Sequence, residues 1–349
     1  MEEYRKVLTA WYKRNRRELP WRGSQDPYKI WVSEVILQQT RVGQGMDYYH
    51  NFLQTFPDVQ SLALAPEEEV LKVWQGLGYY SRARNMHHSA QTIMNLFGGQ
   101  FPDNYLSIRN LKGIGDYTAA AIASIAFDLP YAVVDGNVYR VLSRLFGIPT
   151  PIDSPAGKKE FYALAQMMLD TSRPGEFNQA LMEFGAIQCI PGRPDCEKCP
   201  LSQKCYAFLN QSITDFPIKT KQVRQRERFL NYLCISWQDK VLLEKRGDKD
   251  IWRNMYQFPL IETPLAVSPE GIIGSAEWKS LLSKHTFTIE SVFPERIHIL
   301  THQRLLIRFF LISVDGDDLP NGMIAVEKSV ISKFPVPKPI ELFLLQMGY

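Results

Sequence analysis

Two carboxylic acids of the chain, Glu34 and Asp135, stand in surroundings that suit different protonation states. Glu34 lies four residues after Ile30 and three before Leu37, on an apolar helix stripe where desolvation is expected to raise its pKa. Asp135 precedes Gly136 at a polar helix start, which favours the charged form. Such a pair can divide acid and base work between its members. A structural hydrogen bond for Glu34 and a simple helix N-cap for Asp135 are the alternative interpretations.

Four of the five cysteines fall close together with the spacing C-x6-C-x2-C-x5-C. They are Cys189, Cys196, Cys199 and Cys205. A disulfide framework is usually spread through a small secreted chain, so this clustering indicates a metal site. Four thiolates suit either zinc or an iron–sulfur cluster, and the single C-x2-C pair favours the cluster. The fifth, Cys234, lies in an expected strand and is predicted to be a buried thiol.

A glycine turn precedes the region of Asp135. Gly113 and Gly115 flank Ile114 just before the Ala- and Ile-rich run 119–126, which predicts a helix. Glycines let a ligand approach the backbone, and helix N-termini attract anions, so this turn suits a phosphate. Gly-x-Gly before a helix is also common as a plain turn.

The first 210 residues predict an all-α domain that positions these groups. Apolar periodicity indicates further helices at 5–17, 45–55, 67–75, 82–97 and 105–109. The basic run 13–17 suits a solvated face or a DNA contact.

A change of pattern after residue 212 predicts a second domain. Residues 213–228 are basic and lack apolar periodicity, so we expect an interdomain linker there. Period-two alternation then predicts strands at 229–237, 240–247, 285–293, 296–302 and 304–315, with helices at 276–284 and 339–347. The predicted fold is multidomain, with an all-α domain over 1–212 and an α+β domain over 229–349.

Composition is that of a soluble globular protein, with 45% apolar and 22% charged residues in 349. The net charge is only +3, so any nucleic-acid surface must come from local clustering. The N-terminus lacks an apolar signal-peptide core, and no run of 18 apolar residues is present. We therefore expect a cytoplasmic protein with no membrane partner.

Taken together, these motifs resemble those of the helix-hairpin-helix DNA base-excision glycosylases related to endonuclease III, and within them the MutY family of adenine glycosylases. The helix-hairpin-helix falls at 108–127, ahead of Asp135, and the cysteine spacing matches over 189–205. The segments Trp31-Val32-Ser33-Glu34-Val35 and Gly76-Leu77-Gly78-Tyr79-Tyr80-Ser81-Arg82 are similar to those of adenine glycosylases. The resemblance covers the whole chain. It implies that the four cysteines bind a [4Fe–4S] cluster with a structural, DNA-associated role.

The resemblance also implies a role for each carboxylate. Glu34 is the general acid that protonates a flipped adenine, and Asp135 stabilises the sugar cation that forms as adenine departs and bonds to it. Breaking an N-glycosidic bond needs one protonated and one ionised carboxyl, as in glycoside hydrolases. Tyr117 and Asn137 support this site.

Further residues are implied to contact DNA. Gln39 and Tyr79 are expected wedges that fill the base stack, and Gly113 and Gly115 belong to the DNA-binding hairpin. Relatives that also nick the strand carry a lysine in the register Gly-x-Gly-x-Lys. Tyr117 occupies that position here, so we expect hydrolysis only.

The second domain resembles the Nudix-like C-terminal domain of adenine glycosylases. No Nudix box follows Pro264, so a phosphohydrolase is disfavoured. The family reads 8-oxoguanine through a loop usually written Phe-Ser-His, and the matching residues here are Leu300-Thr301-His302. Thr301 keeps the hydroxyl and His302 keeps the imidazole, whereas Leu300 loses the aromatic ring. A surface histidine beside a strand is the simpler interpretation of His302.

The implied partner is double-stranded DNA that contains A:8-oxoguanine or A:G mispairs, bound by a monomer. A bifunctional glycosylase/lyase for oxidised pyrimidines is one alternative, which Tyr117 disfavours. A non-enzymatic DNA-damage binder is the other, and the presence of both Glu34 and Asp135 disfavours it.

Overall fold

The structure is a computed structural model that describes residues 1–349 except 221–224, 248–249, 284 and 316–321. The chain forms two compact units. The first comprises Met1–Leu64 and Asn85–Lys221, and the second comprises Ala65–Arg84 and Gln222–Tyr349. Within the described residues, no helix has the length and apolar character needed to cross a membrane.

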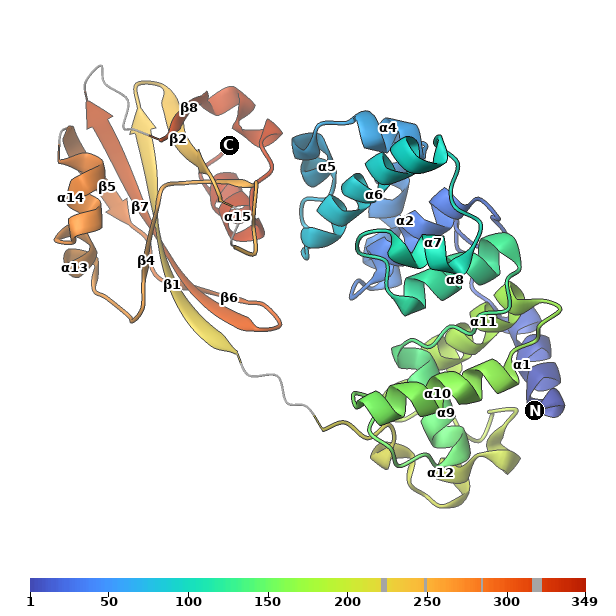
Figure 1. The fold of residues 1–349 in the computed structure, drawn as a ribbon. Coiled ribbons are helices and arrows are strands. Elements are labelled where there is room, and N and C mark those ends of the chain that lie inside the picture. Colours follow the sequence, from blue (N-terminus) through green and yellow to red (C-terminus); the bar gives the residue numbers. More distant parts are fainter. Residues whose placement is uncertain (221–224, 248–249, 284, 316–321) are drawn as a thin grey trace. The chain divides into compact units, whose positions relative to one another are not determined.

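The first unit is helical, as predicted (Figure 1). Its α-helices are α1 (Glu2–Asn15), α2 (Pro27–Leu37), α3 (Val42–Thr55), α4 (Val59–Leu64), most of α6 (Ser81–Phe97), α7 (Tyr105–Asn110), α8 (Asp116–Phe127), α9 (Gly136–Phe146), α10 (Pro155–Met168), α11 (Pro174–Glu183) and α12 (Tyr206–Leu209). A π-helical turn η1 (Phe184–Gln188) continues α11, and two 3-10 turns follow, η2 (Ser202–Lys204) and η3 (Ile213–Asp215). The helix α5 (Glu67–Val73) and the first turn of α6 belong to the second unit.

The helices that carry the predicted site residues begin where the sequence places capping groups. At α2, the Asp26 side chain accepts a hydrogen bond from the Tyr28 N–H at 2.9 Å, and Pro27 occupies the first turn. At α9, Asp135 itself caps the helix. The helix α8 follows Gly115 and ends at Phe127, and its C-cap residue Asp128 is in the left-handed region.

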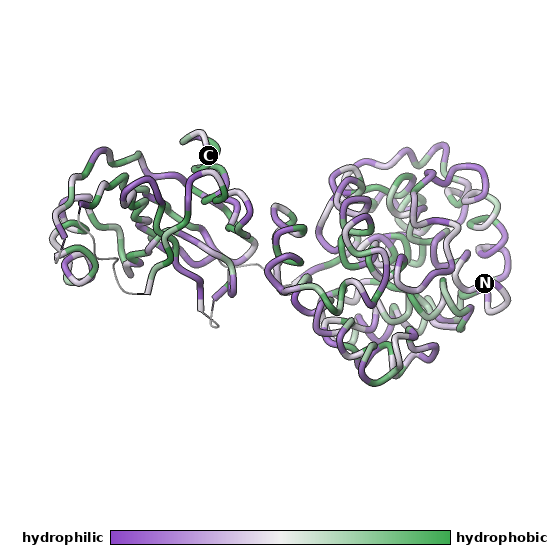
Figure 2. Tube along the Cα trace, turned by 90° about the horizontal axis from the view of Figure 1, so that it is seen from above, coloured by the Kyte–Doolittle hydropathy of each residue, from purple (hydrophilic) through white to green (hydrophobic). Residues whose placement is uncertain are grey.

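One apolar core joins both ends of the first unit's sequence. Leu8 and Trp11 of α1, Val141 and Leu145 of α9, and Phe184 belong to one cluster of buried side chains. Figure 2 shows hydrophobic and hydrophilic stretches alternating along the chain, as expected for elements with one buried face.

The second unit is built on a mixed sheet, and its α+β class is also confirmed (Figure 1). Its strands are β1 (Arg226–Trp237), β2 (Lys240–Lys245), β3 (Tyr256–Gln257), β4 (Leu260–Thr263), β5 (Thr286–Val292), β6 (Arg296–Ile299), β7 (Gln303–Asp315) and β8 (Ile324–Glu327). Its other helices are α13 (Pro269–Ile273), α14 (Ala276–Leu282), the 3-10 turn η4 (Lys328–Lys333) and α15 (Lys338–Gln346). The long strands β1 and β7 are parallel, and β6 forms an antiparallel hairpin with β7.

Helices cover both faces of this sheet. Successive residues of β7 point to opposite faces, so neighbouring side chains of β7 contact different helices. Phe310 packs on Trp278 of α14, with ring centroids 5.5 Å apart. Its neighbour Phe309 stacks on Phe343 of α15, with centroids 4.0 Å apart. The expected buried thiol, Cys234, is fully buried within β1.

The stretch 213–228 that was expected to be a linker is only partly described. The strand β1 begins at Arg226, inside that stretch, because Arg226 pairs with Gln303 of β7. Residues 221–224 of the stretch and residue 284 of the expected helix 276–284 lie outside the described residues.

Candidate active site

Glu34 and Asp135 line one pocket of the first unit, with a volume of about 870 Å³. Tyr117, Asn137 and Gln39 line the same pocket. Glu34 comes from α2, Tyr117 from the first turn of α8, and Asp135 from the start of α9. The structure thus brings together five residues that were predicted as site residues from widely separated parts of the sequence.

Glu34 is held by a hydrogen bond from Tyr117. The Tyr117 hydroxyl donates to Oε2 of Glu34 at 2.6 Å, and it also lies 3.6 Å from the sulfur of Met182. The pKa of Glu34 is raised to about 7: burial is the largest cause, the Tyr117 hydrogen bond lowers it, and the charge of Asp135 raises it. The expected rise in pKa is therefore found. A carboxyl with such a pKa carries its proton in a large share of molecules at neutral pH.

Asp135 is fixed by its own helix. Its Oδ1 accepts from the Val138 N–H at 2.7 Å, and its Oδ2 accepts from Nδ2 of Asn137 at 2.7 Å. Burial raises the pKa of Asp135 as well, while these hydrogen bonds lower it. The sequence suggests that the two pKa values are shifted in opposite directions. In the structure, both pKa values are raised. The two carboxyls differ in how many hydrogen bonds favour the charged form, and Asp135 has more of them.

Arg140 is a site residue that was not predicted. It donates to Oδ1 of Asn137 at 2.8 Å, to the Gly185 carbonyl at 2.7 Å and to the Cys189 carbonyl at 2.7 Å. Arg140 therefore links the residue that holds Asp135 to the first cysteine. The available signal was a charged residue three positions after Asn137, on the same helix face.

A buried carboxylate at the end of α11 was also missed. Glu183 is only 1% exposed and accepts hydrogen bonds from Arg17 at 2.7 and 2.9 Å and from Arg22 at 2.8 Å. Burial raises the pKa of Glu183, but the two arginines outweigh it and hold the pKa at about 2. Arg17 belongs to the basic run 13–17, so at least this member of the run is engaged within the protein.

The glycine turn before α8 is exposed. Gly113 has a φ of +82°, and a Cβ there would stand 2.6 Å from Cβ of Asn85, so the turn requires glycine. Gly115 is exposed and directly precedes the helix. The two exposed glycines let an anion approach the backbone of the turn.

The two expected wedge residues share an unusual backbone. Gln39 and Tyr79 have φ values of 58° and 48°, in the left-handed region that non-glycine residues rarely adopt. Gln39 is exposed, and Tyr79 is 45% exposed. Strained, exposed residues of this kind cluster at functional sites.

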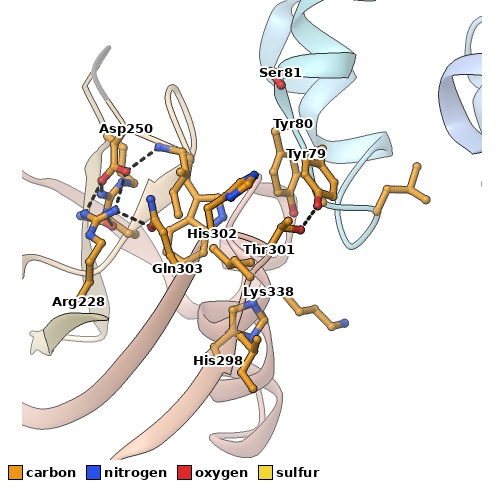
Figure 3. Close-up of a pocket in the computed structure, with 18 of the residues that line it drawn as sticks. Tyr79, Tyr80, Ser81, Arg228, Asp250, His298, Thr301, His302, Gln303 and Lys338 are labelled. Atoms are coloured by element: carbon orange, nitrogen blue, oxygen red, sulfur yellow. Dashed lines mark hydrogen bonds and ion pairs between the residues drawn. The ribbon is translucent and has the colours of Figure 1, made fainter. Parts of the chain in front are cut away.

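In the second unit, Thr301 and His302 occupy the exposed turn between β6 and β7. The hydroxyls of Thr301 and Tyr79 are hydrogen-bonded to each other, as Figure 3 shows. Two residues that the sequence predicts to contact DNA, more than 200 positions apart, therefore meet within this unit. Both line a pocket of about 1440 Å³, which is larger than the pocket of the two carboxylates. The carboxylates Asp250 and Glu262 line this larger pocket, but both form ion pairs with Arg228, so size alone does not mark the reactive site.

The four cysteines line one small cavity together with Arg144. Arg144 donates to the Cys189 sulfur at 3.5 Å, and its carbonyl lies 3.4 Å from the Cys205 sulfur. Burial raises the pKa of Cys199 to about 11. In the part of the chain that the structure describes, no three His, Cys, Asp or Glu side chains are arranged to hold a metal ion. Four thiols around one cavity nevertheless fit the donor set of an iron–sulfur cluster, and the cluster stays a prediction.

Family models match both units. Residues 32–164 match the HhH-GPD superfamily of base excision DNA repair proteins, and residues 231–346 match the NUDIX domain. The chain is 33% identical over 304 residues to the adenine DNA glycosylase of Buchnera aphidicola subsp. Schizaphis graminum, covering 86% of this chain and 85% of that protein. It is 44% identical over 213 residues to the adenine DNA glycosylase of Homo sapiens, covering 58% of this chain and 39% of that protein.

Solved structures match the helical part. A thermostable thymine-DNA glycosylase superposes with a TM-score of 0.56 at 31% identity, covering 60% of this chain and 96% of that chain. A trapped endonuclease III–DNA covalent intermediate superposes with a TM-score of 0.52 at 20% identity, covering 60% and 97%, which shows the fold alone. The relative matched over 85% of its length and the succession of the two domain types together establish that the chain belongs to the MutY family of adenine DNA glycosylases.

Proposed function

We propose that this DNA glycosylase removes adenine mispaired with 8-oxoguanine or guanine from duplex DNA, by hydrolysis alone. The observation that carries the proposal is the carboxyl of Glu34, hydrogen-bonded to Tyr117 and sharing a pocket with Asp135. Family membership supports adenine as the base that leaves and DNA as the partner.

Glu34 is the proton donor in this proposal. The target adenine must first leave the base stack, at a cost of a few kcal/mol. Protonated Glu34 then gives its proton to a ring nitrogen of adenine. The bond between the sugar C1′ and the base breaks, its electron pair stays on adenine, and positive charge develops on the sugar.

Asp135 balances that charge. Hydrogen bonds from Val138 and Asn137 favour its ionised form and fix its orientation, so it is prepared to stabilise the sugar cation and to bond to C1′. Water then attacks C1′ and breaks the bond to Asp135, which leaves as a carboxylate, and a proton of that water passes to the carboxylate of Glu34, which restores the acid.

Tyr117 supports hydrolysis without strand cleavage. A lyase reaction needs an amine that forms a Schiff base with the sugar, and a phenol cannot form one. Borohydride should therefore trap little covalent adduct with the wild-type protein, and Tyr117→Lys should gain trapping. Abundant trapping by the wild type would support the bifunctional alternative.

The remaining DNA contacts are assigned by exposure and resemblance. Gln39 and Tyr79 fill the gap left by the flipped base, and the turn at Gly113 and Gly115 binds a phosphate. Thr301 and His302 contact the base opposite adenine with a hydroxyl and an imidazole. Leu300 offers no aromatic face for stacking.

We assign the glycosylase domain to residues 1–212 and the Nudix-like domain to 229–349. The linker 213–228 joins them, and its last residues, from Arg226 on, already belong to β1. Cys189, Cys196, Cys199 and Cys205 would hold a [4Fe–4S] cluster, which supplies a covalent brace between segments of the chain. No step of base excision uses it.

An alkali assay tests the proposal. A duplex with one A:8-oxoguanine pair is incubated with protein and analysed with and without hot alkali. Strand breaks only after alkali are expected, because hydrolysis leaves an abasic site. Breaks without alkali would indicate a lyase, and no breaks at all would indicate a binding protein.

The matched control is Asp135→Asn. Asparagine keeps the size and the cap but has no charge to offset the sugar cation, so excision should fall by about 100-fold or more. DNA affinity should change little. Excision near the wild-type rate would show that Asp135 does not have this role.

A further inference from the structure

The exposed turn of the β6–β7 hairpin is tied down along its main chain. The Leu300 N–H donates to the Gln303 carbonyl at 2.8 Å, which closes the turn. The His302 carbonyl accepts from the Arg226 N–H at 3.0 Å. The start of β1 therefore holds the turn, whose residues Thr301 and His302 are exposed.

Arg228, two residues further along β1, uses its whole guanidinium inside the protein. Its Nε and one Nη donate to Glu262 at 2.7 Å each, and both Nη atoms donate to Asp250 at 2.9 Å. The remaining donor reaches Oε1 of Gln303 at 3.2 Å. A guanidinium has five N–H donors, and all five are engaged. Figure 3 shows Arg228 between Asp250 and Gln303.

The partners of Arg228 are themselves fixed. Asp250 also forms an ion pair with Arg246, and its Oδ1 accepts from the Ile251 N–H at 2.6 Å. Glu262 belongs to β4, which pairs with β1. The Arg228 side chain is only 10% exposed. A network of charged hydrogen bonds centred on the largely buried Arg228 thus ends on the side chain of Gln303, the residue that follows His302.

We propose that Arg228 is a positioning residue for reading the base opposite adenine. It holds Gln303, and through it the orientation of the turn that carries Thr301 and His302. This inference rests on the proposed function, because it concerns how the opposite base is distinguished.

Arg228 stands in a basic stretch, so a direct phosphate contact is the obvious alternative. Its five engaged donors leave none for a phosphate, and two carboxylates already neutralise its charge. Lysine cannot replace it, because an ammonium has three donors and no planar fork. Arg228→Lys therefore keeps the positive charge but cannot form all five hydrogen bonds of the guanidinium.

The test measures single-turnover excision on two duplexes that differ only in 8-oxoguanine or guanine opposite adenine. Arg228→Lys should slow excision opposite 8-oxoguanine about tenfold and opposite guanine less than twofold. Gln303→Met, which keeps both carboxylate contacts of Arg228, should act in the same direction. The matched control is Arg304→Lys, because the Arg304 side chain is 44% exposed and its ion pair with the exposed Glu227 is long, at 3.5 Å. It should leave both rates within twofold.

The double variant Arg228→Lys, Gln303→Met distinguishes positioning from general support of the fold. If Arg228 acts through Gln303, the double variant loses no more discrimination than the worse single variant. Additive losses, equal losses on both duplexes, or no loss from Gln303→Met would overturn the proposal. Gln303→Met decides the matter if Arg228→Lys fails to fold. A wild-type protein without adenine excision refutes the proposed function instead, and equal wild-type rates on both duplexes refute opposite-base reading.

Discussion

The hydroxyl of Tyr117 donates a 2.6 Å hydrogen bond to the carboxyl of Glu34, a residue 83 positions earlier in the chain. This bond stabilises the ionised form of Glu34 and so lowers a pKa that burial has raised. The acidity of the proposed proton donor is thus set by a balance between its own burial and one phenol.

Tyr117→Phe should shift that balance. Without the hydrogen bond, the pKa of Glu34 rises above its value of about 7. The alkaline limb of the pH–rate profile for excision should move to higher pH, because Glu34 keeps its proton longer. Tyr105→Phe, outside the pocket, is the control and should leave the profile unchanged. An acid shift for Tyr117→Phe would contradict the prediction.

Glu34→Gln should abolish excision yet stabilise the protein at high pH. The folded pKa of about 7 lies above the ordinary value of 4.5, so the carboxyl favours folding below about pH 4.5 and this contribution is lost as pH rises through 7. The neutral amide avoids that loss. We expect Glu34→Gln to gain on the order of 2–3 kcal/mol at pH 9 and nothing near pH 4. Urea unfolding at both pH values checks this, and a pH-independent difference would refute it.

Glu183→Gln should have the opposite pH dependence. The pKa of Glu183, about 2, lies below its ordinary value, so its contribution to stability is present above about pH 4.5 and is lost as pH falls towards 2. Removing the charge leaves Arg17 and Arg22 without their carboxylate, at a cost of about 3–5 kcal/mol near neutral pH.

The control for Glu183 lies on the same helix. Glu176 is 28% exposed and pairs with Lys13 and Arg173, so Glu176→Gln should cost at most about 1 kcal/mol. Thermal melts at neutral pH separate the two variants. Similar losses would mean that the burial of Glu183 is unimportant.

The four cysteines around one cavity lead us to expect iron in the purified protein. The purified protein should be yellow-brown and contain about four irons per chain. Cys199→Ser should lose iron, solubility and DNA affinity, whereas Cys234→Ala, in the sheet of the second unit, should keep all three. Stoichiometric zinc without iron would refute the cluster.

Local patterns predicted the elements and the two carboxylates, because capping and periodicity are local properties. Asp135 was placed as a helix cap, and Glu34 on an apolar stripe, from neighbours within four positions. The partners of Arg140 and Arg228 could not be predicted in this way. Gly185 lies 45 positions from Arg140, and Gln303 lies 75 positions from Arg228, so only the folded chain identifies these contacts.

The grouping of residues 65–84 with the second unit could not be predicted from local patterns either. Helical periodicity identifies α5 as a helix but not the surface it packs against. From the sequence, Arg17 and Arg228 are only members of basic stretches. Their carboxylate partners lie far away in the chain, so the sequence of either stretch does not indicate the ion pairs.

Those paired arginines have a consequence for how DNA affinity should depend on salt. A side chain that neutralises a phosphate releases a condensed counterion, and each such contact steepens the salt dependence by about 0.9 in the logarithmic slope. Arg17, Arg22 and Arg228 already hold carboxylates, so they release none. Titrations of binding against potassium chloride should therefore give the same slope for Arg228→Lys as for the wild type. Arg17 and Arg228, one from each of the stretches 13–17 and 213–228, serve folding, so the counterions displaced from DNA will be fewer than a count of the arginines in these stretches suggests.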